Sequence, residues 1–152
     1  MPRVTLDGMG NVVSDFTCIS CHTDRDAANQ LQVPAGQLDL TDGLAPEEQD
    51  QFEAYRELLI NDVEVEVNMG ALQPRLVQTG TDPVTGAPIL STVNVAPSAR
   101  GAGANASPVF FSRFAPGGTH AGYLNEGELR LIAEWLDIGA QYYNDPFRVP
   151  QD

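Results

Sequence analysis

The chain has 152 residues, of which 42% are apolar and 19% charged, a composition typical of a folded domain rather than of a disordered segment. Twenty-one acidic residues against eight basic ones give a formal charge of −13. A surface this acidic repels phosphate groups, so we expect neither nucleic-acid binding nor attachment to a membrane surface. All eight basic residues are arginines, which excludes chemistry that needs a lysine, such as Schiff-base formation.

In chain order, residues 1–14 have no helical period and predict an extended lead-in segment. A helix is predicted at about 46–60, where the apolar side chains share one face. The apolar period then changes to two, which is typical of strands. Because a turn from Asp82 to Gly86 separates two β-branched runs, we expect a β-hairpin or flap at about 63–95.

Two further helices are predicted in the last third of the chain. The segment 107–114 favours one or two helical turns, and the segment 125–143 has the strongest helical pattern. Asn125 and Glu128 form a variant of the capping box at the start of the longer helix. Two apolar stripes run along this helix, so we expect it to be largely buried.

One short motif carries most of the chemical information. Cys18-Ile19-Ser20-Cys21-His22 has the pattern C-x-x-C-H, at which haem is attached covalently to c-type cytochromes. Two cysteines three residues apart on a helical turn reach both vinyl groups of one porphyrin, and the following residue places an imidazole under the iron. The motif therefore predicts one haem c, bound through Cys18 and Cys21, with His22 as an axial ligand.

Three other interpretations of the same residues remain open. A thioredoxin-like dithiol pair would need a βαβ context, which the pattern around Cys18 does not supply. A structural zinc site would need a fourth ligand beside Cys18, Cys21 and His22, and His120 is the one histidine that remains. The third interpretation is a chance occurrence of the pattern.

The motif and the segment LNEGELRLIAEWLDIGA resemble the two ends of a class I cytochrome c domain. More closely, PAGQLDLTDG, AYRELL and EWLDIGAQYYNDPF are similar to monohaem cytochrome domains of secreted multidomain bacterial proteins, some of which carry polysaccharide-binding or polysaccharide-degrading modules. The resemblance covers one domain at about 15–147, followed by a tail at 148–152. It implies a mainly α cytochrome c fold that wraps one covalent haem, with the flap at 63–95 as an insertion.

The second axial ligand, where a side chain supplies it, has four candidates: His120, Met69, Met9 and Met1. His120 lies on a loop shortly before the last helix, which is where the resemblance places this ligand. Glycines on both sides of His120 let the backbone approach a flat cofactor closely. We therefore expect His120, with Met69 as the alternative, and two imidazole ligands imply a lower potential than one imidazole and one thioether.

Other side chains have smaller predicted roles. Arg113 and Arg75 are expected to bind the haem propionates, because a guanidinium group pairs with a carboxylate through two hydrogen bonds. Asp39 and Asp42 lack the spacing of an EF-hand loop, so calcium is not expected. Four aromatic residues either line the haem or pack in the core: Phe110, Phe111, Phe114 and Trp135.

Together these features predict a one-electron carrier rather than an enzyme, monomeric, with a redox partner that has a basic docking patch. The alternatives are a haem enzyme or small-gas sensor with an open sixth position, and a zinc-stabilised interaction module. No apolar run approaches the ~20 residues of a transmembrane helix, and no secretory signal is visible. Because the resemblance implies maturation linked to export, we expect a periplasmic or secreted protein whose signal peptide is absent from this chain.

Overall fold

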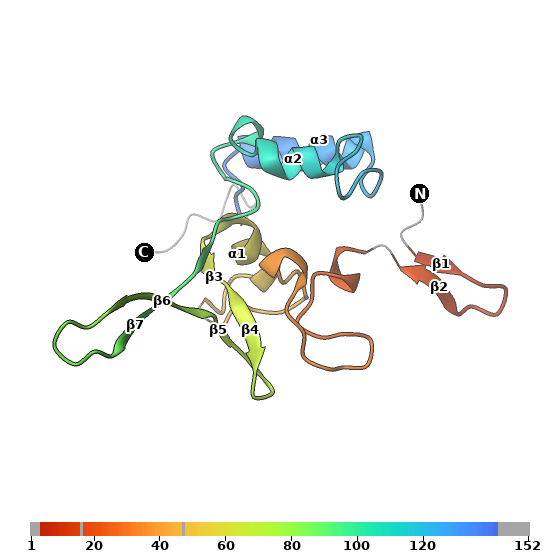
Figure 1. The fold of residues 1–152 in the computed structure, drawn as a ribbon. Coiled ribbons are helices and arrows are strands. Elements are labelled where there is room, and N and C mark those ends of the chain that lie inside the picture. Colours follow the sequence, from red (N-terminus) through yellow and green to blue (C-terminus); the bar gives the residue numbers. More distant parts are fainter. Residues whose placement is uncertain (1–3, 16, 47, 143–152) are drawn as a thin grey trace.

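The structure is a computed structural model that describes residues 4–15, 17–46 and 48–142, with the side chains of 4–5 and 12–15 left out. The described residues form three α-helices and four two-stranded antiparallel sheets. Figure 1 shows two helices together on one side of the molecule, with the third helix and the strands below them. The expected tail at 148–152 lies outside the described residues.

The upper layer contains helices α2 (Pro108–Phe114) and α3 (Glu126–Asp137). The predicted capping box at α3 is confirmed: Glu128 N donates to Asn125 Oδ1, and Asn125 N donates to Glu128 Oε2, both at 2.9 Å. The helix ends earlier than expected because Gly139 and Ala140 adopt positive φ angles of 92° and 52°. Within the described part of the chain, no helix has the length and hydropathy needed to cross a membrane.

The expectation that α3 is largely buried is wrong. Of its residues only Leu136 is fully buried, whereas Leu131 is 68% exposed and Ile138, directly after the helix, is 56% exposed. Leu131 and Ile138 of the second apolar stripe therefore face outward, whereas Trp135 packs against the core. The helix packs against the 3₁₀ turn Ala104–Ala106 and the small core cluster around Leu136, which leaves Leu131 uncovered.

Helix α1 (Glu53–Leu59) is shorter than the predicted 46–60. The preceding residues form a loop instead, in which Ala45 N donates to Gln51 O at 2.8 Å and Glu48 N donates to Ala45 O at 3.2 Å. These hydrogen bonds satisfy the backbone without a helix. The later start follows from this closed loop.

The strands form hairpins and one longer-range pair (Figure 1). The pairs are β1 (Val4–Leu6) with β2 (Val12–Asp15), β3 (Asp62–Val63) with β8 (Asn94–Val95), β4 (Val65–Asn68) with β5 (Ala71–Pro74), and β6 (Leu76–Thr81) with β7 (Pro88–Thr92). The predicted turn after β6 is present, where Asp82 Oδ1 accepts from Val84 N at 2.7 Å and from Thr85 N at 2.9 Å. The segment predicted to form one hairpin or flap thus contains two hairpins.

The predicted fold class, a mainly α cytochrome c fold with a flap at 63–95, is wrong. The three described α-helices have only 7, 7 and 12 residues, and much of the chain between α1 and α2 forms antiparallel pairs of strands. The physical reason is that the helices predicted at 46–60 and 125–143 form only over Glu53–Leu59 and Glu126–Asp137, whereas the alternating, β-branched segment between α1 and α2 forms strands as its pattern indicates. The resemblance rested on short segments outside it.

The core is small and joins the two layers. Ala99, Leu136 and Ala140 are buried there, and further apolar side chains from all three helices pack against them: Leu59, Phe110, Phe111, Ile132 and Trp135. The chain exposes 10881 Å², whereas a compact protein of 16.3 kDa exposes about 7,500 Å². The fold is therefore open, with hairpins that extend from the body.

Candidate haem-binding site

The cysteine motif forms a helical turn. A 3₁₀ turn spans Cys18–Ser20, and Cys18 O accepts hydrogen bonds from Cys21 N at 3.3 Å and from His22 N at 2.9 Å. Both cysteines are exposed free thiols. The turn that the motif requires is thus formed, with both thiols accessible to a cofactor.

The imidazole of His22 is half-buried and oriented by one hydrogen bond. Its Nδ1 lies 3.2 Å from Leu38 O. Because a carbonyl oxygen only accepts, Nδ1 carries the proton, and the lone pair of Nε2 is available to a metal. A metal-binding histidine in proteins commonly has this kind of support.

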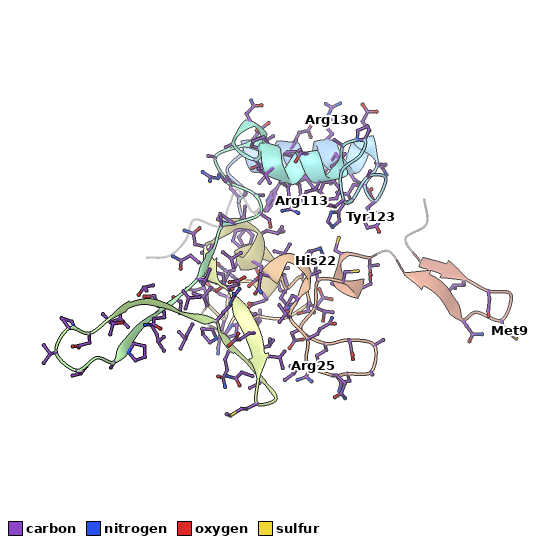
Figure 2. The ribbon with its side chains drawn as sticks, in the orientation of Figure 1. Met9, His22, Arg25, Arg113, Tyr123 and Arg130 are labelled. Atoms are coloured by element: carbon purple, nitrogen blue, oxygen red, sulfur yellow. The ribbon has the colours of Figure 1, made fainter. Side chains whose placement is uncertain are left out.

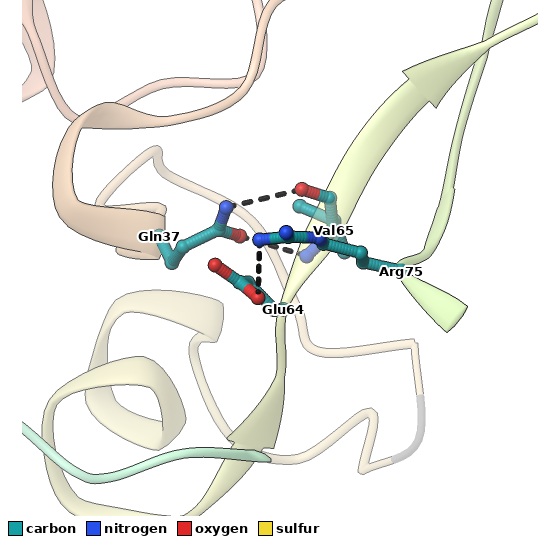
Figure 3. A network of polar contacts seen from close by, with 4 residues as sticks. All are labelled: Gln37, Glu64, Val65 and Arg75. Atoms are coloured by element: carbon teal, nitrogen blue, oxygen red, sulfur yellow. Dashed lines mark hydrogen bonds and ion pairs between the residues drawn. The ribbon is translucent and has the colours of Figure 1, made fainter. Parts of the chain in front are cut away.

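The turn that contains Leu38 is hydrogen-bonded to strand β4. The side chain of Gln37 pairs with the backbone of Val65, donating from Nε2 to O at 3.0 Å and accepting from N at Oε1 at 2.7 Å (Figure 3). Leu40 N also donates to His22 O at 3.0 Å. These contacts fix the segment 35–40 against the motif and so hold His22 in place.

His120 lies on the loop between α2 and α3. Its backbone N donates to Arg113 O at 2.8 Å, and its Nδ1 lies 2.8 Å from Thr119 Oγ1. Gly118 makes this loop possible, because a Cβ at that position would overlap the carbonyl oxygens of Arg113 and Ser112. The loop therefore closes onto the end of α2 and leaves Nε2 of His120 available.

The two histidines face one another across the layers. Their ring centroids are 5.9 Å apart and their planes differ by 23°. Two metal–nitrogen bonds of ~2 Å, with ~1 Å from each nitrogen to its ring centre, put two imidazoles that share one metal ion ~6 Å apart. Figure 2 shows His22 in the lower layer, with Arg113 and Tyr123 on the facing side of the upper layer. The observed ring separation is close to that of two imidazoles that share one metal ion, and the two rings are nearly parallel.

The surroundings of His120 favour its neutral form. Phe114 and Tyr123 lie beside it, with ring centroids at 5.5 and 5.6 Å. Burial lowers the pKa of His120, and the neighbouring imidazole of His22 and guanidinium of Arg113 lower it further. Neutral imidazole is the form that binds a metal. Tyr123 was not among the expected residues, although an aromatic side chain three positions after His120 could have suggested it.

No protein-family model, curated protein or solved structure matches this chain. The candidate site is therefore defined by its motif and its geometry.

The methionine candidates for the second ligand lie elsewhere. Met69 is 98% exposed in the turn between β4 and β5, and in Figure 1 this turn points away from α2 and α3. Met9 is 85% exposed in the β1–β2 hairpin at the edge of the molecule (Figure 2). Met1 lies outside the described residues. Of the candidates that the structure describes, it brings His120 to His22 and neither methionine.

The two arginines expected at the propionates are placed differently. Arg113 lines a cavity of about 380 Å³ between the turn at 36–38, the end of α1 and the start of α2. Arg75 does not line this cavity and pairs instead with Glu64 at 3.0 Å (Figure 3). Arg100, which sequence reasoning missed, lines the cavity with Arg113. It stands in a loop of small residues that carries no motif.

The predicted aromatic residues divide between the two roles. Phe114 contacts His120, whereas Phe110, Phe111 and Trp135 pack against the core. Exposed apolar side chains also surround the site: Ile19 within the motif is 45% exposed and Tyr123 beside His120 is 47% exposed. A flat apolar cofactor between the layers would cover such groups.

The structure gives the zinc interpretation no support. Among the described residues, no three His, Cys, Asp or Glu side chains form a group that could hold a metal ion. Zinc would require Cys18, Cys21, His22 and His120 to converge as four ligands. A haem needs only two axial ligands from the protein, because the porphyrin supplies the others.

Asp39, which was considered as a calcium ligand, is part of a local turn. Its carboxylate accepts hydrogen bonds from Thr41 N at 2.9 Å and from Thr41 Oγ1 at 2.7 Å.

Proposed function

We propose that this chain binds one haem c covalently through Cys18 and Cys21, with His22 and His120 as the two axial ligands, and that it carries single electrons. The facing pair of imidazoles, with ring centroids 5.9 Å apart, carries this proposal. The proposal does not require a cytochrome c fold. It needs a C-x-x-C-H turn and a second ligand on the opposite layer.

Each residue of the site has a part in holding the cofactor. The exposed thiols of Cys18 and Cys21 would form the two thioether bonds, and Nε2 of His22 and of His120 would bind the iron. Arg113 lines the neighbouring cavity and can pair with a propionate. A bound haem supplies one-electron chemistry, since its iron changes between the ferric and ferrous states.

A filled sixth position distinguishes an electron carrier from a haem enzyme or gas sensor. His120 is held close to His22 by a loop that closes onto α2, with Arg113 O as the acceptor for its backbone N at 2.8 Å. This placement favours electron transfer over substrate or gas binding at the iron. Two imidazole ligands also favour a low potential.

The experiment that tests this proposal is the double variant Cys18→Ala, Cys21→Ala. The wild-type protein should be red, with the mass of one covalently bound haem. Acid–acetone extraction should remove all haem from the variant and none from the wild type. Ser20→Ala, within the same turn, is the matched control and should keep its haem. A colourless wild-type protein without the added mass would contradict the proposal.

The charge of −13 also predicts the kind of partner. An acidic carrier docks on a basic patch, and the attraction between opposite charges speeds association at low salt. We place both proteins in the periplasm or outside the cell, because the C-x-x-C-H resemblance implies maturation linked to export. Stopped-flow electron transfer to a basic acceptor should slow as salt rises. A rate independent of salt would contradict this part of the proposal.

A further inference from the structure

A single peptide group connects His22 to a carboxylate on another element. The carbonyl of Leu38 accepts from His22 Nδ1 at 3.2 Å, and the N–H of the same peptide unit, at Asp39, donates to Glu57 Oε2 at 3.0 Å. Glu57 lies on α1, 35 residues from His22 in the sequence. The chain thus contains a continuous relay of imidazole, peptide and carboxylate.

The environment of Glu57 raises the pKa of its carboxyl group. Glu57 is half-buried and lines the cavity beside the site. Desolvation raises the pKa of Glu57 to about 8, helped by a hydrogen bond to the side chain of Asp62 on β3. Its charge therefore changes at mildly alkaline pH, and its Oε2 is the atom that accepts from Asp39 N.

We propose that Glu57 is a positioning residue for His22 that acts through the Leu38–Asp39 peptide and makes electron uptake at the site proton-dependent. The proposal rests on the proposed function, since it concerns the iron ligand His22. It adds a hydrogen-bonded connection from His22 to an ionisable carboxyl group, which the C-x-x-C-H motif alone does not contain. Glu57 itself touches neither the iron nor the other ligand His120 in this scheme.

The direction of the coupling follows from charge. An ionised Glu57 polarises the peptide, so that Leu38 O becomes a stronger acceptor and His22 a more electron-rich ligand. Such a ligand favours the ferric state and lowers the potential. If a bound haem accepted one electron from a one-electron donor, the positive charge of the site would fall by one, and Glu57 would then take up a proton from solvent. The potential should therefore fall as pH rises.

Other charged groups face Glu57 and set where it titrates. On its own helix the negative charge of Glu53 raises the pKa of Glu57 further, as does that of Asp62, whereas the hydrogen bond from Asp39 N lowers it. Two cations line the same cavity, Arg100 and Arg113.

The test is redox potentiometry of the haem-loaded protein from about pH 6 to about pH 10, with wild type compared against Glu57→Gln. We expect the wild-type potential to fall by about 59 mV in total, which corresponds to a tenfold difference in proton affinity between the two oxidation states. Glu57→Gln should stay near the low-pH value of the wild type throughout. Glu66→Gln, which removes an exposed carboxylate on β4, should keep the wild-type profile.

A second variant keeps the proposal testable if Glu57→Gln fails to take up haem. Asp62→Asn removes the group whose hydrogen bond and charge raise the pKa of Glu57, so the fall in potential should move to lower pH. A haem-loaded wild type with a potential independent of pH would overturn the coupling and leave the proposed function standing. The same slope in wild type and Glu57→Gln would also overturn it. A protein without haem would overturn both.

Discussion

Two regions connect the layers of this molecule in different ways. Around Leu136 the layers meet through buried apolar side chains, and Tyr55 OH donates to Ala140 O at 3.0 Å. Around His22 and His120 they meet through two nearly parallel imidazoles whose ring centroids are 5.9 Å apart. The first region is filled by apolar side chains, whereas the second holds two imidazoles beside the exposed Cys18 and Cys21.

The two regions differ in how much buried apolar side chains contribute to the free energy of folding. In the packed region, burial of Leu136 contributes the usual hydrophobic free energy, on the order of 2 kcal/mol for such a side chain. In the region of the two histidines, Cys18 and Cys21 are exposed, so these side chains add little hydrophobic free energy to folding but are accessible for reaction. Substitutions in the two regions should therefore have separable effects on cofactor binding and on unfolding.

The largest effect that separates the regions is expected for His120→Ala. Loss of one imidazole opens the iron, so the ferrous protein should bind carbon monoxide, which the wild type should not. The potential should rise if water or a thioether replaces the imidazole. The covalent haem should remain, because Cys18 and Cys21 are unchanged.

Met69→Ala is the matched control for that variant, because Met69 is 98% exposed and remote from His22. Its spectrum should be the same as that of the wild type. A red-region band of sulfur-to-iron charge transfer that disappears in Met69→Ala and persists in His120→Ala would reverse the assignment of the second ligand.

In the packed region, Leu136→Ala should lower the free energy of unfolding by about 2–5 kcal/mol, because it leaves a cavity at a fully buried position. Chemical denaturation followed by circular dichroism measures this change. Leu131→Ala on the same helix is the control, since Leu131 is 68% exposed and its loss should cost little. Equal losses in the two variants would show that the core is not where the structure places it.

The smallest effect concerns Glu57 and the pH dependence of stability. Its pKa rises from an ordinary 4.5 to about 8 on folding, so between these values the native state holds more protons than the unfolded state. Stability from this group is complete below the lower value and is lost as pH rises through the higher one. Above about pH 8, Glu57→Gln should be more stable than wild type by about 1 kcal/mol, after allowance for solvent screening. Denaturation at pH 4 and pH 9 checks this, because no gain at the higher pH would contradict it.

Local features of the sequence predicted local structure well. The Asn125 capping box, the turn after β6 and the short helix after Ser107 all depend on neighbouring residues, and all are present. The C-x-x-C-H turn is local in the same sense. The overall class was wrong because the helices predicted at 46–60 and 125–143 are shorter than their apolar patterns indicated, and the resemblance rested on short segments.

The site itself was only partly predictable. His22 and His120 could be proposed as a pair because the chain has just two histidines. Glu57, Arg100 and the Leu38 carbonyl could not be found this way, since their positions depend on contacts between distant segments. No periodicity or motif indicates that Gln37 pairs with Val65 and so places the carbonyl beside His22.

The most direct test of the central claim, that His22 and His120 are the two axial ligands of one covalent haem, is the absorption spectrum of the purified protein. The spectrum should show a Soret band, sharp bands in the reduced protein and no red-region sulfur-to-iron band in the oxidised protein, and it should not change when carbon monoxide is added. A spectrum without haem bands would contradict the claim. So would a reduced spectrum that carbon monoxide converts at once, because His120 would then not occupy the sixth position.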